Sequence, residues 1–151
     1  MDQQREFDVV LFGATGFTGK LVAEYLYKTY GVGGELRWAL AGRNQAKLEA
    51  VRTDLIAAGG TTVELIVVDS MDQAAMNALA ARTTVVCTTV GPYALYGTPL
   101  VAACVAHGTH YCDLTGEVQW MHRVINEYQT AAETSGARIV HTCGFDSIPS
   151  D

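Results

Sequence analysis

The sequence lacks several features that mark membrane, secreted and nucleic-acid-binding proteins. It has no apolar run long enough to cross a bilayer, and its first residues, Met1 to Glu6, are polar and lack the apolar core of a signal peptide. Basic residues are outnumbered by acidic ones, 10 to 16, so the formal net charge is −6, and they form no continuous stripe. We therefore predict a cytoplasmic protein with no integral membrane segment and no nucleic-acid partner.

Cysteine and histidine pairs at metal-binding spacing are also missing. The four cysteines show no CxxC pattern and the four histidines no HExxH pattern. Cys87 and Cys104 lie inside apolar runs, where a free thiol behaves as a small apolar side chain. The sequence thus favours buried free thiols over disulfides, and we expect no metal site.

The sequence does contain a regular alternation of strand-like and helix-like segments. Short apolar or β-branched runs alternate with segments in which apolar residues recur at helical spacing. Asn44 can cap one helix, Ser70 and Gln73 have capping-box spacing for another, and Thr98 precedes a proline at the start of a third. The predicted strands are residues 7–12, 36–41, 62–68, 84–90, 109–114 and 137–143. This alternation predicts an α/β fold, a Rossmann-like doubly wound parallel sheet of about six strands in the order 3-2-1-4-5-6.

Three glycines follow the first predicted strand with the spacing GxxGxxG. We expect Gly13 to form a tight turn, Gly16 to let the backbone approach a diphosphate, and Gly19 to let the next helix pack closely on the strand. Free amide groups and the dipole at the start of that helix favour negative charge. The alternative is a glycine-rich turn that binds nothing, but the strand before and the helix after favour a dinucleotide site. The predicted diphosphate contacts are Gly13, Ala14, Thr15, Gly16, Phe17, Thr18 and Gly19.

The end of the second strand indicates which dinucleotide is bound. An acidic residue there favours NAD, whereas an arginine can pair with the 2′-phosphate of NADP. The sequence has Arg43 at this point and no acidic residue, so it predicts NADP and makes NAD the less favoured cofactor. Asp69, at the end of the third strand, could accept a hydrogen bond from the adenine amino group or cap the next helix, and both interpretations stay open.

Candidate catalytic residues follow the fourth and fifth strands. Gly91, Pro92 and Tyr93 break the fourth strand where a second ribose and the nicotinamide would pass, and we expect all three to contact the cofactor. Tyr93 and Tyr96 could donate protons, but the Tyr-x-x-x-Lys pair of short-chain dehydrogenases is absent. Asp113 ends the fifth strand and could face the site or cap the following helix. Tyr93 and Asp113 are therefore the predicted catalytic residues.

Five blocks of this sequence together resemble the N-terminal part of the saccharopine dehydrogenase-like oxidoreductases. The first block is shared by many NADP-binding families, whereas the last three, in this order, are more specific. The resemblance is closest to the branch that contains the trans-acting enoyl reductases. The blocks are residues 9–20 (VVLFGATGFTGK), 41–44 (AGRN), 89–93 (TVGPY), 110–117 (HYCDLTGE) and 144–151 (GFDSIPSD).

The resemblance implies an NAD(P)-dependent oxidoreductase that transfers a hydride between the nicotinamide and a C=C or C=N bond of an unidentified small molecule. It places the glycine block on the diphosphate, Arg43 on the 2′-phosphate and residues 91–93 near the nicotinamide ribose. Family members are longer, with a second region that supplies substrate binding and the contacts of a homodimer. Residues 1–151 are then the dinucleotide-binding domain alone, inactive by itself. The alternative function is a non-catalytic, NADP-binding redox sensor or regulatory domain.

Overall fold

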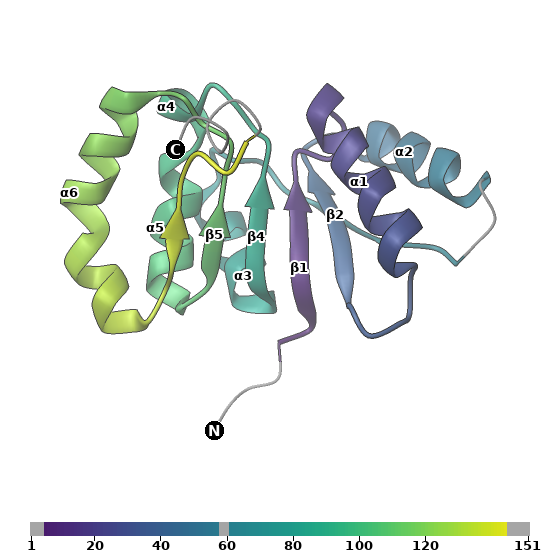
Figure 1. Cartoon of the computed structure of the whole chain (residues 1–151), viewed down its shortest axis with the longest axis horizontal. Helices are drawn as coiled ribbons and strands as arrows, with labels where there is room; N and C mark the ends of the chain where they lie inside the picture. Colours follow the sequence, from purple (N-terminus) through teal and green to yellow (C-terminus); the bar gives the residue numbers. More distant parts are fainter. Residues whose placement is uncertain (1–4, 58–60, 145–151) are drawn as a thin grey trace.

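The computed structural model describes residues 5–57 and 61–144, which contain a six-stranded parallel sheet. The strands lie in the order β3-β2-β1-β4-β5-β6, so the predicted Rossmann-like fold and strand order are confirmed (Figure 1). The first strand is central, because it pairs with β2 on one side and β4 on the other. The strands are β1 (Phe7–Phe12), β2 (Trp38–Gly42), β3 (Glu64–Val67), β4 (Thr83–Thr88), β5 (His110–Cys112) and β6 (Ile139–Val140).

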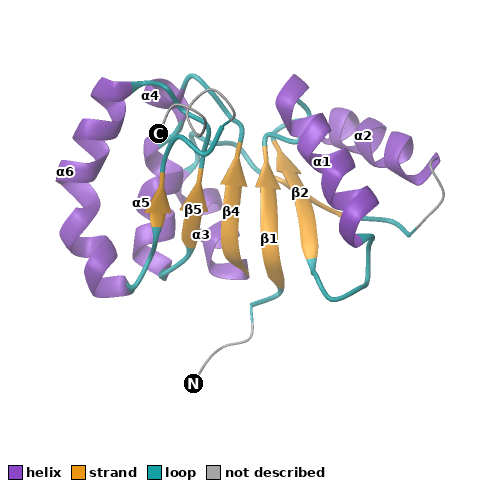
Figure 2. Cartoon of the chain, viewed as in Figure 1, coloured by secondary structure: helices purple, strands orange, loops and turns teal. Residues whose placement is uncertain are grey.

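Helices pack on both faces of the sheet (Figure 2). Helices α1 and α2 share one apolar cluster with one face, while α3, α5 and α6 share a second cluster with the other. None of the helices in the described residues is both long and apolar enough to span a bilayer. The helices are α1 (Phe17–Tyr30), α2 (Gln45–Ala57), α3 (Gln73–Arg82), α4 (Tyr93–Tyr96), α5 (Thr98–His107) and α6 (Val118–Ser135).

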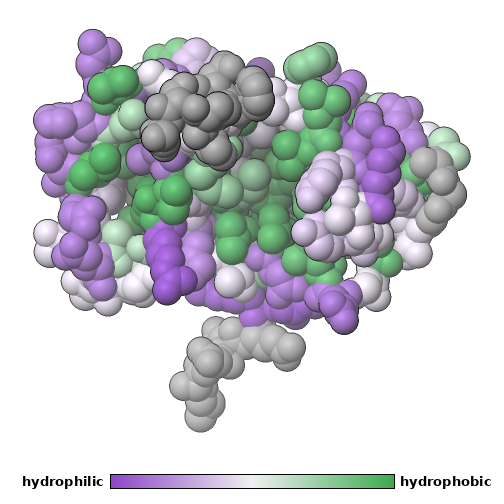
Figure 3. All heavy atoms as spheres, viewed as in Figure 1, coloured by the Kyte–Doolittle hydropathy of each residue, from purple (hydrophilic) through white to green (hydrophobic). Residues whose placement is uncertain are grey.

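The sheet face that carries α1 and α2 is open over β4 to β6 in the described residues. Cys87 packs toward the α1 cluster, and the parallel register places Cys112 and then Val140 beside it on the same face. Figure 3 shows apolar surface between α1 and α6 on this side of the molecule. All four cysteines are free thiols, but only Cys104 is fully buried, and Cys143 is exposed, so the expected burial holds in part.

One helix start and one short helix differ from the sequence-based expectation. The helix predicted to begin after Ser70 instead begins at Gln73, and Asp72 caps it by accepting a hydrogen bond from the Ala75 amide at 3.0 Å. The short helix α4 was not predicted, since four residues are too few for a recognisable period. By contrast Asn44 caps α2 as predicted, with its side-chain oxygen 3.0 Å from the Lys47 amide nitrogen.

Candidate functional site

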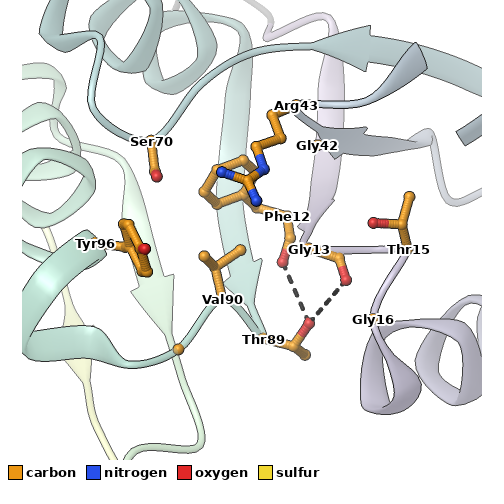
Figure 4. A pocket seen from close by; sticks show the side chains of 11 residues that line it. Phe12, Gly13, Thr15, Gly16, Gly42, Arg43, Ser70, Thr89, Val90 and Tyr96 are labelled. Carbon is orange, nitrogen blue, oxygen red and sulfur yellow. Dashed lines mark hydrogen bonds between the residues drawn. The ribbon is translucent and has the colours of Figure 1, made fainter. Parts of the chain in front are cut away.

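A pocket of about 310 Å³ lies at the carboxyl ends of β1, β2 and β4. The connections that follow the neighbouring strands β1 and β4 leave toward opposite faces of the sheet here, and ligands of open α/β sheets bind at such a point. In Figure 4 Arg43 extends over the centre of the pocket, with Thr15 and Gly16 on one side of it and Tyr96 on the other. The lining residues are Phe12, Gly13, Thr15, Gly16, Gly42, Arg43, Ser70, Thr89, Val90, Gly91 and Tyr96.

The glycine turn between β1 and α1 has the geometry that the sequence predicts for Gly13 and Gly19. Gly13 has φ +92°, a conformation that side chains disfavour, and an added Cβ would lie 2.8 Å from the Thr89 hydroxyl. Gly19 is buried, and its added Cβ would run into the Gly13 carbonyl oxygen. The turn and the close approach of α1 to β1 therefore both require glycine.

Gly16 differs from the other two glycines because it is open. Its added Cβ would meet only the Gly13 carbonyl oxygen, at 3.6 Å, so no protein atom requires a glycine here. Gly16 also lines the pocket. A glycine that the fold does not need, on the wall of a pocket, is consistent with the predicted close approach of a ligand.

The N-terminus of α1 carries no side-chain cap and no acidic residue in its first turn. Helices α2 and α3, in contrast, are capped by Asn44 and Asp72. The first amides of any helix have no intrahelical partner, and the dipole adds a partial positive charge. The start of α1 therefore presents free donors beside the pocket, where they can bind an anionic group.

Arg43 follows β2 and supplies a cation to the same pocket. Its side chain is exposed and makes no hydrogen bond or ion pair with any residue in the described parts of the chain. The Gly42 backbone before it is fixed by the sheet, because the Val68 amide donates to the Gly42 carbonyl at 2.9 Å. Arg43 thus extends a guanidinium without a protein partner in the described residues from a fixed stretch of backbone, as a phosphate-binding arginine would.

Asp69 does not cap α3, which was one of the two roles considered in the sequence. Its Oδ1 accepts a hydrogen bond from the Met71 amide at 2.9 Å, forming a local turn, while the cap of α3 is Asp72. The capping interpretation is therefore wrong, and a contact with adenine stays a prediction. The neighbouring Ser70, which was not predicted as a site residue, is buried and lines the pocket.

Thr89 connects the two walls of the pocket. Its hydroxyl donates to the Gly13 carbonyl at 3.2 Å, and its amide donates to the Phe12 carbonyl at 2.9 Å. These bonds hold the end of β4 against the glycine turn, and Figure 4 draws those of the hydroxyl. The sequence placed Thr89 inside the fourth strand, so only the paired structure reveals its contact with a residue 76 positions earlier.

Tyr93, a predicted cofactor and catalytic residue, is the first residue of α4 and does not line the pocket. It is 5% exposed, and its hydroxyl donates to the Thr88 carbonyl at 3.1 Å. Burial raises the pKa of Tyr93 to about 12, so the hydroxyl keeps its proton near neutral pH. Proton donation by Tyr93 stays a prediction, and in this structure the hydroxyl is engaged with the backbone.

Asp113, the second predicted catalytic residue, is 2% exposed and accepts four hydrogen bonds. Oδ2 accepts from His141 Nδ1 at 2.7 Å and from the Tyr111 hydroxyl at 2.8 Å, and Oδ1 accepts from the Thr115 and Thr142 amides, each at 3.1 Å. Burial disfavours the charged form, but these bonds outweigh it and hold the pKa of Asp113 below its ordinary value. Its contacts join the ends of β5 and β6, and it does not cap α6.

Replacing Asp113 with asparagine should lower the free energy of unfolding at neutral pH by about 1 to 2 kcal/mol, because an amide cannot accept all four bonds. Since the pKa of Asp113 is lower in the folded state, its stabilisation is complete above the unfolded value of about 3.9 and is lost as pH falls through the folded value. Urea unfolding from pH 7 to pH 3 should therefore show the gap between wild type and variant closing in acid. Asp54→Asn, at an exposed position in α2, is the control. A gap that stays constant with pH would contradict this account.

The pocket contains five of the predicted cofactor residues, Gly13, Thr15, Gly16, Arg43 and Gly91. The other predicted contacts flank the pocket or lie behind it: Ala14 and Gly19 are buried, and Phe17 is 84% exposed. Whether these contact a cofactor stays a prediction. The residues outside the pocket are Ala14, Phe17, Thr18, Gly19, Asp69, Pro92 and Tyr93.

The groups present in the pocket fit a dinucleotide that carries a 2′-phosphate. The uncapped start of α1 and the open Gly16 suit a diphosphate, and the unpaired Arg43 suits a further phosphate. They lie on neighbouring strands β1 and β2, as the diphosphate and adenosine ends of such a ligand require.

Comparison with known proteins gives a family and several relatives. The model of the family described as saccharopine dehydrogenase NADP binding domain matches residues 9–140. A putative trans-acting enoyl reductase of Mycobacterium tuberculosis is 53% identical over 147 residues, covering 97% of this chain. A trans-acting enoyl reductase of Mycobacterium leprae is 49% identical over 148 residues, covering 98% of this chain. The chain spans 34% of the length of each of these relatives.

Solved structures share the fold at lower identity. The apo saccharopine dehydrogenase (L-Glu forming) of Saccharomyces cerevisiae has a TM-score of 0.72 at 19% identity, covering 93% of this chain and 28% of that one. An NADPH-dependent quinone oxidoreductase of Escherichia coli, in complex with NADPH, has a TM-score of 0.59 at 22% identity, covering 88% and 47%. At these identities the likeness shows the fold alone.

Proposed function

The chain belongs to the family of saccharopine dehydrogenase NADP-binding domains, and from this we propose that it holds NADPH for an oxidoreductase that reduces a carbon–carbon double bond. The observation that carries the proposal is that Arg43 and Gly16 line the same pocket, next to the N-terminus of α1, which has no side-chain cap. The choice of a C=C bond rests on relatives that are named enoyl reductases. The acceptor molecule itself is not identified by any residue of this chain.

The roles of this chain's residues are binding and orientation. The first amides of α1 would hold the diphosphate, with Gly16 giving room for its approach, and Arg43 would pair with the 2′-phosphate. Bound NADPH supplies the hydride. Thr89, by joining β4 to the glycine turn, would fix the part of the pocket where the nicotinamide half passes over β4.

We also propose that the remaining part of the longer protein completes the substrate site. The chain spans 34% of the length of these relatives, and its pocket lies at the carboxyl ends of β1, β2 and β4. A hydride acceptor must be held close to the nicotinamide, and we assign the groups that hold it to that remaining part. The apolar sheet face over β4 to β6 (Figure 3) is a surface that such a region, or a second copy, could cover.

Calorimetric titration of the chain with NADPH and with NADH tests the cofactor site. We expect NADPH to bind at least about tenfold more tightly, because only NADPH offers a 2′-phosphate to Arg43. Equal affinity for the two would contradict the assignment of Arg43, and binding of neither would contradict the proposed site as a whole. Reduction of acyl substrates with a C=C bond is then assayed with the longer protein.

A further inference from the structure

The short helix α4 connects the pocket to the start of α6. Of its four residues, Tyr96 lines the pocket and is half-buried, and its hydroxyl has no hydrogen-bond partner in the described residues. Tyr93, at the other end of the helix, is buried beneath it. The position of Tyr96 therefore depends on whatever fixes so short a helix, which cannot be stable by itself.

Glu117 fixes the N-terminus of α4 from a distant part of the chain. Its Oε1 accepts a hydrogen bond from the Tyr93 amide at 2.6 Å, and its Oε2 accepts one from the Ala94 amide at 2.8 Å. A carboxylate that accepts two amide bonds is a strong contact, and it lies at the end of the helix where negative charge is favourable. Glu117 itself is held, since its amide donates to the Thr115 hydroxyl at 3.0 Å.

Trp120 fixes the other side of α4. Its ring packs on the Tyr93 ring with centroids 5.6 Å apart, and its indole nitrogen donates to the Thr98 hydroxyl at 3.0 Å. Trp120 packs closely against the residue that follows α4, because a Cβ added to Gly97 would lie 2.6 Å from the Trp120 ring. With Glu117 and Trp120 both on or beside the first turn of α6, α4 cannot shift unless α6 moves with it.

The two ends of the pocket are expected to bind different halves of a dinucleotide. Arg43 follows β2, at the adenosine end, whereas Gly91 and Tyr96 follow β4, where the nicotinamide half passes. In Figure 4 Tyr96 lies across the pocket from Thr15 and Gly16. From its place after β4, we expect Tyr96 to affect the nicotinamide half more than the adenosine phosphates.

We propose that Tyr96 contacts the nicotinamide half of the bound dinucleotide and that Glu117, by holding α4, is the positioning residue that places it there. The proposal rests on the proposed NADP site. It assigns a role to Glu117, which ends the block at residues 110–117 and was not among the predicted site residues. It also gives a binding role to Tyr96, for which only proton donation was considered.

The test compares two ligands that share the adenosine end. Wild type, Glu117→Gln and Tyr96→Ala are titrated with NADPH and with adenosine 2′,5′-bisphosphate, which lacks the nicotinamide half. We expect both variants to weaken NADPH binding about fivefold to tenfold, the effect of one or two lost contacts, and to leave bisphosphate binding within about twofold. Leu95→Ala, at an exposed position of α4, and Glu127→Gln, on the exposed side of α6, are the matched controls and should change neither.

The double variant separates a positioning role from two independent ones. If Glu117 acts through Tyr96, adding Glu117→Gln to Tyr96→Ala should cause no further loss of NADPH affinity. Unchanged NADPH binding in Tyr96→Ala would overturn the proposal, and so would equal weakening of both ligands in Glu117→Gln with its thermal unfolding curve intact. Should Glu117→Gln fail to fold, Tyr96→Ala still decides, because Tyr96 makes no hydrogen bond in the described residues. If wild type bound neither ligand, the proposed function would fail instead.

Discussion

Replacing Arg43 with alanine is expected to weaken NADPH binding about tenfold to a hundredfold and to leave NADH binding nearly unchanged. The charge-assisted contact of a guanidinium with a phosphate contributes about 1.5 to 3 kcal/mol, and NADH has no phosphate at that position. Since Arg43 has no protein partner in the described residues, its removal should not lower stability by more than a few tenths of a kcal/mol. Calorimetry with both dinucleotides, together with a thermal unfolding curve, measures these effects.

Lys47→Ala is the matched control for Arg43→Ala. Lys47 is an exposed cation one turn further along, in α2, and it does not line the pocket. It tests whether net charge alone changes affinity for an anionic ligand, and raising the salt concentration should reduce any such general effect. If Lys47→Ala weakened NADPH as much as Arg43→Ala, long-range attraction would replace the specific contact as the explanation.

The strand order and the glycine turn could be predicted because their signals are local. The residues around Gly13 combine a β-branched run, a turn that needs positive φ and a helical period, and each is readable within a few positions. The arginine after β2 is likewise identified by its place at a strand end. Such features do not depend on which distant residues come to lie beside them.

The rotation of α1 shows where the sequence pattern failed. The apolar residues Leu21, Val22, Tyr25 and Leu26 recur at helical spacing, which predicts that they share a buried face, yet Leu21 and Tyr25 are 52% and 60% exposed. The buried residues of α1 are instead Gly19, Ala23 and Tyr27. Because Gly19 packs against the Gly13 carbonyl, its side of the helix faces the sheet, so Leu21 and Tyr25 turn outward while Val22 and Leu26 still pack against the cluster. Close approach of the helix to the turn thus overrides the period of large apolar side chains.

The side of the pocket to which α4 contributes could not be predicted, again because its position depends on distant contacts. Glu117 and Tyr93 are 24 positions apart, and no local pattern indicates that a carboxylate caps a four-residue helix at that distance. The blocks at residues 89–93 and 110–117 were recognised as specific, but their contact appears only once β4 and β5 pair. The ends of β5 and β6 are also shorter than predicted, since the Thr115 and Thr142 amides turn to the Asp113 carboxylate.

Replacing Gly19 with alanine should destabilise the fold by about 3 kcal/mol, the largest stability effect that we expect for a single methyl group here. Its Cβ would run into the Gly13 carbonyl oxygen and lie 2.9 Å from the Ala14 Cα. Both neighbours are backbone atoms, so no side chain can rotate away. Intrinsic helix propensity favours alanine over glycine by about 1 kcal/mol, so the two effects predict opposite signs. Chemical denaturation of the variant therefore decides which one is larger.

Two other glycines make this test specific. Gly116→Ala should change stability little, because nothing lies within 4 Å of its added Cβ. Gly16→Ala should cost no more than about 1 kcal/mol as a helix N-cap, but it should weaken NADPH binding about tenfold or more, since its Cβ would occupy the approach to the α1 amides. A Gly19→Ala protein as stable as wild type would mean that α1 can move away from β1. The GxxGxxG spacing would then reflect the ligand rather than the packing of the helix.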